Sequence, residues 1–354
     1  KAYSAELFFP VFVYRTGAYA PSGQPIANGF RDYYALLNKR DKGIEGHKIV
    51  TEECETKYNT KVGVECFEKL KGKNGGAMLV SPYSTGLTYQ LIPKAPVDKA
   101  VILSMGYGRT AAADGRVFPW VFNFPSTYWS QASAFVQYVG NQIGGLDKLS
   151  GQHIAHLHHN SAYGKEANPT LKALSKKFGF KLTVLAVDHP GQEQKAAWLQ
   201  IRRKRPDWVF MSGWGVMNQV AIKEGNSIGY PMDKFVGNWW SGSDADVIPA
   251  GDGAIGYKST AMHAAGTKFP LFKDIINPII AGWHGGYDPT TMKHPTDLEP
   301  ENLSFSDEQR ASFNTYVVST RIRAARNIRG KPLPPGSTRE TAAEVESILK
   351  TTFE

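Results

Sequence analysis

The 354-residue sequence lacks several features that would narrow its class at once. No segment approaches the roughly 18 consecutive apolar residues that a membrane-spanning helix requires, so no transmembrane helix is predicted. There is no low-complexity tract and no long run of like charges. P-loop, G-x-S-x-G and H-E-x-x-H motifs are also missing, and no other motif points to catalysis. These absences favour a globular protein that is not an enzyme.

Cysteine is scarce: only Cys54 and Cys66 are present, and they lie in neither a C-x-x-C nor a zinc-type spacing. Cys54 closes a strand-like segment, and Cys66 lies on a helical face with Val62 and Leu70. A disulfide from the strand end to the next helix is therefore sterically reasonable. It would contribute roughly 3 kcal/mol and would indicate an oxidising compartment. The alternative is two buried thiols in a cytosolic protein.

The formal net charge is +9, but Lys and Arg are scattered along the chain. The densest basic run, 202–205, ends a helical pattern just before Pro206, where cations complement the helix dipole. No aromatic residues interleave with it, so we expect no nucleic-acid partner. The chain begins at Lys1 and reaches a strand-like run almost immediately. A mature exported chain without its signal peptide would look like this, as would a trimmed one.

Short apolar runs alternate with amphipathic helical stretches, which predicts parallel sheets covered by helices on both faces. A Gly/Pro/Ser-rich loop is expected over 16–23, and a helix bearing Phe30, Tyr33 and Leu37 after it. The alternation restarts after Phe118, so the predicted fold class is α/β with two doubly wound lobes. The expected extended segments are 7–14, 48–51, 77–80, 100–104 and 120–124, then 153–157, 181–187, 208–211 and 235–238.

The last hundred residues are expected to cross between the lobes more than once, as a hinge requires. The expected segments are an extended crossing over 255–262, helices around 272–279 and over 306–328 and 338–350, and a loop over 282–302. We assign 1–124 and 257–332 to lobe 1, and 125–256 and 333–354 to lobe 2.

Two local patterns suggest sites that the rest of the sequence does not support. Gly106 to Ala111 follows a strand and fits G-x-G-x-x-A, but no acidic residue stands about twenty positions on, so we expect no nucleotide cofactor. The glycines are better suited to letting the backbone approach another ligand. Four histidines cluster without a carboxylate or cysteine at ligand spacing, so we expect no metal and solvated side chains on a strand edge. They are His153, His156, His158 and His159.

Aromatic residues follow several expected strands, in both halves of the chain. Ligands of open α/β sheets bind beyond the carboxyl ends of the strands, so these rings predict a flat apolar ligand clamped between the lobes. The alternative is that the rings are buried between sheet and helix. One of the two adjacent tryptophans should face the cleft. The residues are Tyr83, Tyr107, Trp214, Trp239 and Trp240.

In their order along the chain, these features resemble type I periplasmic binding proteins of the branched-chain amino-acid (Leu/Ile/Val) transport group. The resemblance extends from Leu7 to about Ile328. It is carried by the opening strand with the 16–23 loop, the Cys54/Cys66 pair, and the segments 80–86, 158–165, 206–214 and 235–239. It implies two Rossmann-like lobes joined by three crossovers, hinge closure around a small ligand, delivery to the membrane permease of an ABC transporter, a periplasmic location and a monomer.

The resemblance also implies where a ligand carboxylate would be held. The matching positions are Ser84 and Thr85, then Gly106 to Gly108, and hydroxyls and amides at helix N-termini suit an anion. The second-lobe aromatics of the family match Tyr163 and Trp214. Ser22, in the first loop, is a further candidate contact.

One departure from the family pattern concerns the ligand's amine. Amino-acid-binding members carry an acidic residue after the Phe-Val-Gly strand, where this chain has Trp239, and a buried ammonium without its partner costs several kcal/mol. We therefore predict an aromatic acid of benzoate, cinnamate or phenyl-keto acid type. A cation–π contact from Trp239, or the nearby Asp244 or Asp246, could still serve an ammonium. An alignment slip of one residue would exchange Trp239 for Trp240.

Three functions stay open at this level. The first is ligand delivery to a permease. The second is sensing, by the same fold in a receptor ectodomain or an amide-type regulator. The third is a nucleotide-dependent reductase built on the G-x-G-x-x-A loop, which would bind NAD(P).

Overall fold

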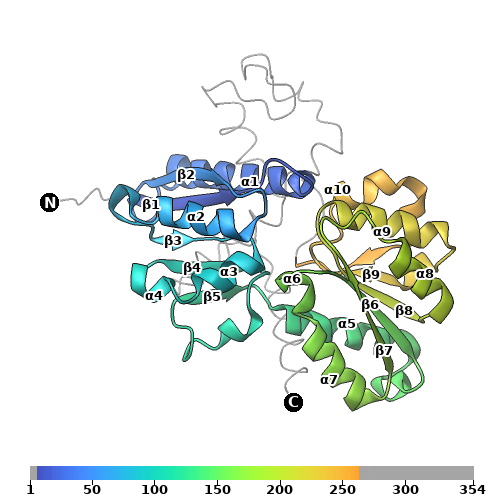
Figure 1. The fold of residues 1–354 in the computed structure, drawn as a ribbon. Helices are drawn as coiled ribbons and strands as arrows, with labels where there is room; N and C mark the ends of the chain where they lie inside the picture. The colour runs from blue at the N-terminus through green and yellow to red at the C-terminus, as the bar shows by residue number, and fades with distance from the viewer. Residues whose placement is uncertain (1–5, 263–270, 272–354) are drawn as a thin grey trace.

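The computed structural model describes residues 6–262 and Leu271, and these form two α/β lobes side by side (Figure 1). The strands of lobe 1 are β1 (Leu7–Val13), β2 (Ile49–Glu55), β3 (Leu79–Val80), β4 (Val101–Met105) and β5 (Val121–Phe124). Its helices are α1 (Ala20–Arg40), α2 (Thr60–Leu70), α3 (Thr85–Leu91) and α4 (Ala95–Asp98), with 3-10 turns η1 (Lys73–Gly75) and η2 (Thr110–Ala113).

Lobe 2 follows the same plan. Its strands are β6 (His153–His159), β7 (Lys181–Val187), β8 (Trp208–Ser212), β9 (Phe235–Gly237) and β10 (Lys258–Ser259). Its helices are α5 (Tyr128–Ile143), α6 (Ala162–Lys165), α7 (Asn168–Phe178), α8 (Lys195–Lys204), α9 (Val216–Ser227) and α10 (Asp244–Val247), with 3-10 turns η3 (Leu146–Leu149), η4 (Met232–Lys234) and η5 (Ile248–Ala254).

All strand pairs in both lobes are parallel, as the βα alternation predicts. In lobe 1, isolated bridges Phe8↔Ala77 and Val11↔Ser81 join the β1–β2 pair to β3, which gives the order β2-β1-β3-β4-β5. Lobe 2 has the equivalent order β7-β6-β8-β9-β10. The α/β fold class with two lobes is therefore confirmed.

Each sheet separates two hydrophobic layers because successive strand residues point to opposite faces. On β1, Phe9, Val11 and Val13 pack with α1, whereas Phe8 and Phe12 pack with α2 and α3. In lobe 2, β6 and β8 likewise send alternate residues toward α8 and α9 on one face and toward α5 and α7 on the other. The cores thus lie between sheet and helices, and the strand ends are left to form a site.

The loop expected over 16–23 is shorter than predicted, because α1 already begins at Ala20. Pro21 lies in the first helical turn, where its missing N–H costs no hydrogen bond. Gly23 is required by close packing, since a Cβ there would lie 2.1 Å from the Tyr14 carbonyl oxygen. The Gly/Pro/Ser-rich composition that suggested a loop therefore belongs to the start of a helix, which packs against the end of β1.

The expectation of solvated histidines on a strand edge is wrong. The histidine strand, β6, is flanked by β7 and β8, and all four of its histidines are buried. Their rings find polar partners within the fold: His156, for example, lies 2.8 Å from Asn168 Oδ1 and 2.9 Å from Ser212 Oγ. Burial lowers the pKa of His156 to about 3, which keeps its ring neutral.

One connection between the lobes falls within the described residues: the chain passes from β5 to α5 at 125–127. After β10, Met262 and Leu271 pack against the hydrophobic cluster that contains much of the lobe 1 core. The expected segments over 272–279, 282–302, 306–328 and 338–350, and with them the third crossover, lie outside the described residues. No described helix is long and apolar enough to span a membrane.

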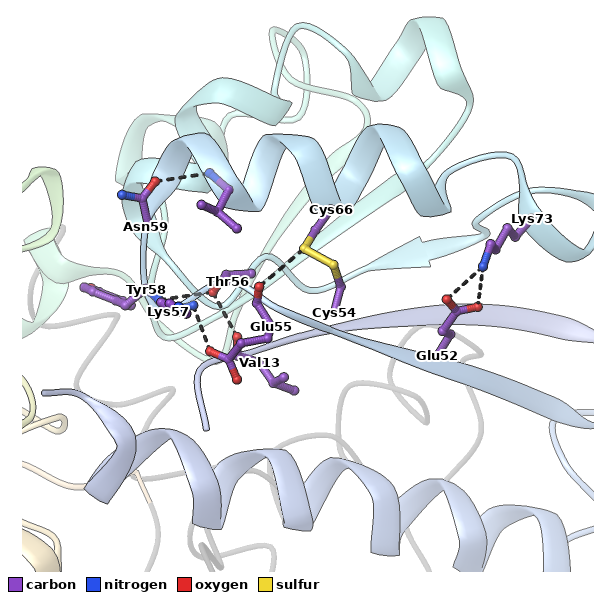
Figure 2. The surroundings of a disulfide bond; sticks show 11 residues. Val13, Glu52, Cys54, Glu55, Thr56, Lys57, Tyr58, Asn59, Cys66 and Lys73 are labelled. Atoms are coloured by element: carbon purple, nitrogen blue, oxygen red, sulfur yellow. Dashed lines mark hydrogen bonds and ion pairs between the residues drawn. A yellow bond between two sulfur atoms is a disulfide. The ribbon is translucent and has the colours of Figure 1, made fainter. Parts of the chain in front are cut away.

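The predicted disulfide is present. Cys54 on β2 is bonded to Cys66 on α2, with a Cα–Cα distance of 5.8 Å, and Figure 2 shows the turn that the bond closes. Within that turn, Thr56 donates from both its N–H and its hydroxyl to the Val13 carbonyl, and the Asn59 side chain caps α2 by accepting from the Val62 N–H. Tyr58 stands in the same turn, with a φ of 57°.

The disulfide gives the first prediction. Replacing both cysteines, Cys54→Ser with Cys66→Ser, should lower the free energy of unfolding by about 3 kcal/mol, because the bond removes the closure entropy of a short loop from the unfolded chain. Denaturant unfolding of the oxidised protein and the double variant measures this. The reduced wild type is the matched control and should unfold with the double variant; a wild type unchanged by reduction would contradict the prediction.

Candidate functional site

A pocket lies between the lobes, where the carboxyl ends of both sheets face each other. The empty space between its walls, together with open solvent at its mouth, is about 250 Å³. Six tyrosines, two tryptophans and two hydroxyl residues line it: Tyr14, Tyr58, Tyr83, Ser84, Thr85, Tyr107, Tyr128, Tyr163, Trp214 and Trp240. Among the described residues, no charged side chain is part of the lining. The aromatic lining suits a small, flat molecule.

The lobe 1 wall is built from rings that follow β1, β3 and β4. Tyr14 comes directly after β1 and stacks on Tyr83, with ring centroids 5.2 Å apart and planes 18° from parallel. Tyr83 has a φ of 57°, a left-handed conformation that is costly for a tyrosine. Its N–H donates to the hydroxyl of Tyr107 at 2.8 Å, which secures this unusual turn. The strained backbone delivers Ser84 and Thr85 to the pocket at the start of α3.

The G-x-G-x-x-A segment forms a tight loop beside this wall. Gly106 and Gly108 have φ values of 65° and 93°, and a Cβ on Gly108 would lie 2.6 Å from Ser104 Oγ. The Gly108 N–H donates to Thr85 Oγ1 at 3.0 Å, so the loop and the start of α3 are joined. The glycines serve close backbone packing here.

The two adjacent tryptophans after β9 have different roles. Trp240 lines the pocket, and its ring contacts Trp214 edge-on at 5.3 Å. Trp239 lies outside the lining and stacks on Tyr128 at 5.6 Å. Both indole N–H groups donate to the Gly106 carbonyl, at 2.7 Å from Trp239 and 3.0 Å from Trp240. This pair therefore joins lobe 2 to the glycine loop of lobe 1.

The pocket carries neutral hydrogen-bond donors. Burial raises the pKa of the Tyr14, Tyr58, Tyr128 and Tyr163 hydroxyls, so all four stay protonated at neutral pH. Trp214 is 6% exposed, and its indole N–H has no hydrogen-bond partner among the described residues. A buried donor of this kind is expected to meet an acceptor, since an unmade hydrogen bond costs about 1–3 kcal/mol. That acceptor would have to come from a ligand or a water.

The acidic residues near the tryptophan pair are engaged elsewhere. Asp246 is 2% exposed and accepts from Asn218 Nδ2 and from the N–H and hydroxyl of Ser243, as part of a capping box at α10. Burial raises its pKa to about 6. Neither Asp244 nor Asp246 is part of the pocket lining. The described pocket thus offers a ligand ammonium no carboxylate.

Seven of the residues that the sequence predicted as ligand contacts line the pocket in the structure: Tyr83, Ser84, Thr85, Tyr107, Tyr163, Trp214 and Trp240. Gly106 and Gly108 shape the adjoining loop, Trp239 stands behind Tyr128, and Ser22 is buried on α1 outside the lining. Three lining tyrosines were missed. Tyr14 and Tyr58 follow β1 and β2 and obey the same strand-end rule, whereas Tyr128 opens α5 and carried no signal of its own.

Comparison with known proteins identifies the family to which this two-lobed chain belongs. A family model described as periplasmic binding protein matches residues 6–270, about three quarters of the chain. The chain belongs to this family. The match stops short of Ile328, to which we expected the resemblance to extend. A solved structure described as an ABC transporter permease from the Pseudomonas fluorescens group is 38% identical, with a TM-score of 0.72 over 93% of this chain and 78% of that one.

Two further solved structures support the fold of this periplasmic binding protein. One is a branched-chain amino-acid ABC transporter protein from Thermus thermophilus with bound valine, 18% identical, TM-score 0.67, covering 96% of this chain and 81% of that one. The other is an ABC transporter solute-binding protein from Rhodopseudomonas palustris HaA2 in complex with p-hydroxybenzoic acid, 13% identical, TM-score 0.67, covering 91% and 80%. The family model thus identifies the chain as a periplasmic binding protein, and these two structures support its fold.

A separate similarity covers a short stretch. Over 80 residues the chain is 44% identical to the testis isozyme of creatine kinase from Oncorhynchus mykiss. That stretch is 23% of this chain, and the chain spans only a fifth of that enzyme. Similarity over a fifth of an enzyme does not assign its activity.

The glycine loop gives the second prediction. Gly108→Ala should lower the free energy of unfolding by about 1–3 kcal/mol, because alanine at a φ of 93° is strained and its Cβ would press on Ser104. Gly115→Ala is the matched control: no atom lies within 4 Å of its Cβ position, so its effect should stay within about 0.5 kcal/mol. Equal melting curves for the two variants would contradict this reading.

Proposed function

We propose that this protein is the periplasmic, non-enzymatic component of an ABC importer and captures a small aromatic carboxylate by closing its lobes. The observation that carries the proposal is the pocket itself: eight aromatic rings, neutral donors and no charged side chain among the described lining residues. Ring faces hold a flat apolar body by offset or edge-on contacts. The captured acid would then be passed to a membrane permease.

The carboxylate of such a ligand would be met by neutral donors. Ser84 and Thr85 stand at the N-terminus of α3, and Trp214, whose N–H has no partner among the described residues, lines the same pocket from lobe 2. Hydrogen bonds to a charged acceptor are worth about 1.5–3 kcal/mol each, so a few of them can hold an anion without a cationic side chain. The bound p-hydroxybenzoic acid in the Rhodopseudomonas palustris relative is in keeping with this ligand class.

An α-amino group would lack a carboxylate partner in this pocket. Asp246 accepts three hydrogen bonds from Asn218 and Ser243, and neither Asp246 nor Asp244 is in the lining. A buried, unpaired ammonium costs several kcal/mol. The absence of a described anionic partner therefore favours an acid without an amine.

The second candidate is a branched-chain amino acid. An aromatic cage attracts a cation through its ring faces, most strongly with tryptophan, and Trp214 and Trp240 both line the pocket. The Thermus thermophilus relative has valine bound. This candidate needs the cage to replace the missing carboxylate.

A thermal-shift screen separates the two candidates. We expect benzoate, p-hydroxybenzoate and cinnamate to raise the melting temperature, and leucine and valine to leave it unchanged. A ligand at 100 times its dissociation constant adds about 2.7 kcal/mol to the stability of the protein. Phenylalanine and phenylpyruvate form a matched pair that differs at the α-carbon. A shift with phenylalanine or valine and none with the acids would reject the aromatic-acid proposal.

The Trp214 donor can be tested by itself. Trp214→Phe keeps a ring in the wall and removes the N–H, so carboxylate affinity should fall at least tenfold, the equivalent of a hydrogen bond to a charged group. Isothermal titration with the acid that gives the largest thermal shift measures this. Trp129→Phe, at a site 41% exposed, is the control and should bind like the wild type. Unchanged affinity in Trp214→Phe would place the carboxylate elsewhere.

A further inference from the structure

Glu166 connects the lobes outside the pocket. It lies at the end of α6, three residues beyond the pocket residue Tyr163, and only 8% of it is exposed. Both of its carboxylate oxygens accept hydrogen bonds from lobe 1. Oε1 accepts from the hydroxyl of Tyr89 on α3, and Oε2 accepts from the N–H of Thr110 at 3.0 Å.

The two lobe 1 segments that Glu166 contacts each adjoin part of the pocket wall. Tyr89 lies on α3, which is capped by Ser84 and begins at Thr85 in the wall, and Thr110 follows the loop from Gly106 to Gly108 that holds the wall residue Tyr107. A single lobe 2 side chain therefore bridges both wall segments. These bonds require the two lobes to be close together, as they are in this structure.

We propose that Glu166 is a positioning residue that latches the closed form and takes up a proton when the lobes close over a ligand. The proposal rests on ligand capture by lobe closure, as proposed above, but not on the chemical identity of the ligand. Glu166 is not part of the pocket lining, so the same latch would act on an aromatic acid or on an amino acid.

The proton uptake follows from the surroundings of the carboxylate. The adjacent charged residues are Arg109, whose guanidinium lies over the Tyr89 ring, and exposed Lys165; neither forms an ion pair with Glu166 in the described structure. Burial raises the Glu166 pKa from 4.5 to about 7, against the lowering effect of the hydrogen bond from the Thr110 N–H. Because the closed-state pKa is the higher one, this contribution to closure is present at low pH and is lost as the pH rises through 7.

A second contact between the lobes titrates in the opposite sense. The hydroxyl of Tyr19 lies 2.9 Å from His159 Nε2 and 2.7 Å from His189 Nδ1. Burial lowers the pKa of both histidines, to about 3 for His159, so acid disfavours closure there. The pH dependence of ligand binding by the wild type combines both effects. The contribution of Glu166 must therefore be measured as the difference from a variant that keeps both histidines.

The test compares the wild type with Glu166→Gln, which keeps an acceptor for Thr110 and polar contact with Tyr89 but cannot titrate. Dissociation constants for p-hydroxybenzoate and L-valine are measured from pH 6 to pH 8. We expect the ratio of the wild-type to the Gln-variant constant to rise about tenfold over this range. Glu166→Ala should release ligand at least about tenfold faster, since it leaves both lobe 1 donors unpaired. Glu193→Gln, at an exposed lobe 2 position, should behave like the wild type.

The outcomes separate the latch from the ligand proposal. If valine binds and p-hydroxybenzoate does not, the aromatic-acid proposal fails and the valine data decide on the latch. A constant ratio across the pH range, or wild-type release from Glu166→Ala, would overturn the latch. If neither probe binds, solution scattering of ligand-free Glu166→Arg should show a larger radius of gyration than the wild type at pH 6, and equal radii would overturn it.

Discussion

The strand order of the two sheets fixes where a ligand can bind. In each lobe the chain begins at an inner strand, adds one neighbour, and then restarts on the other side, between β1 and β3 and between β6 and β8. The helices that follow these strands leave toward opposite faces: α1 and α3 pack on different layers, as do α7 and α9. Their divergence opens a crevice at the carboxyl ends of the strands. Tyr14 and Tyr83 stand at one crevice, and Trp214 stands at the other.

The chemistry of the pocket follows from which side chains can be buried there at a small cost in desolvation free energy. Phenol and indole groups bring large apolar area together with a polar handle, and they carry no charge to desolvate. Burial raises the pKa of the tyrosines further, so they remain donors over the physiological range. A ligand that brings its own negative charge can use these donors, whereas one that also brings a positive charge needs a counter-ion that the described wall lacks. Selectivity in this account is the cost of an unpaired charge.

Sequence periodicity predicted the strands, the sheet type and the two-lobed fold because these depend on local hydrophobic pattern. The strand-end rule also found most of the pocket. It failed where geometry depends on contacts distant in sequence. The helix start at Ala20 follows from packing of Gly23 against Tyr14, the buried setting of His159 from the central place of β6, and the place of Tyr128 from Trp239 and Trp240. Glu166 carried no sequence signal, since its partners come from the other lobe.

The pocket wall and the contacts between the lobes around it contribute to binding in different ways. The described pocket wall is uncharged, whereas the surrounding contacts between the lobes place Glu166 and the His159–Tyr19–His189 group at the interface. If these titratable groups stood in the wall, ligand preference would depend on pH. At the interface between the lobes, they make only the closure equilibrium depend on pH. Because closure free energy adds equally to every ligand that the closed form encloses, changes at Glu166 should alter all affinities by one factor. Changes in the wall, as at Trp214, should instead alter the ranking of ligands.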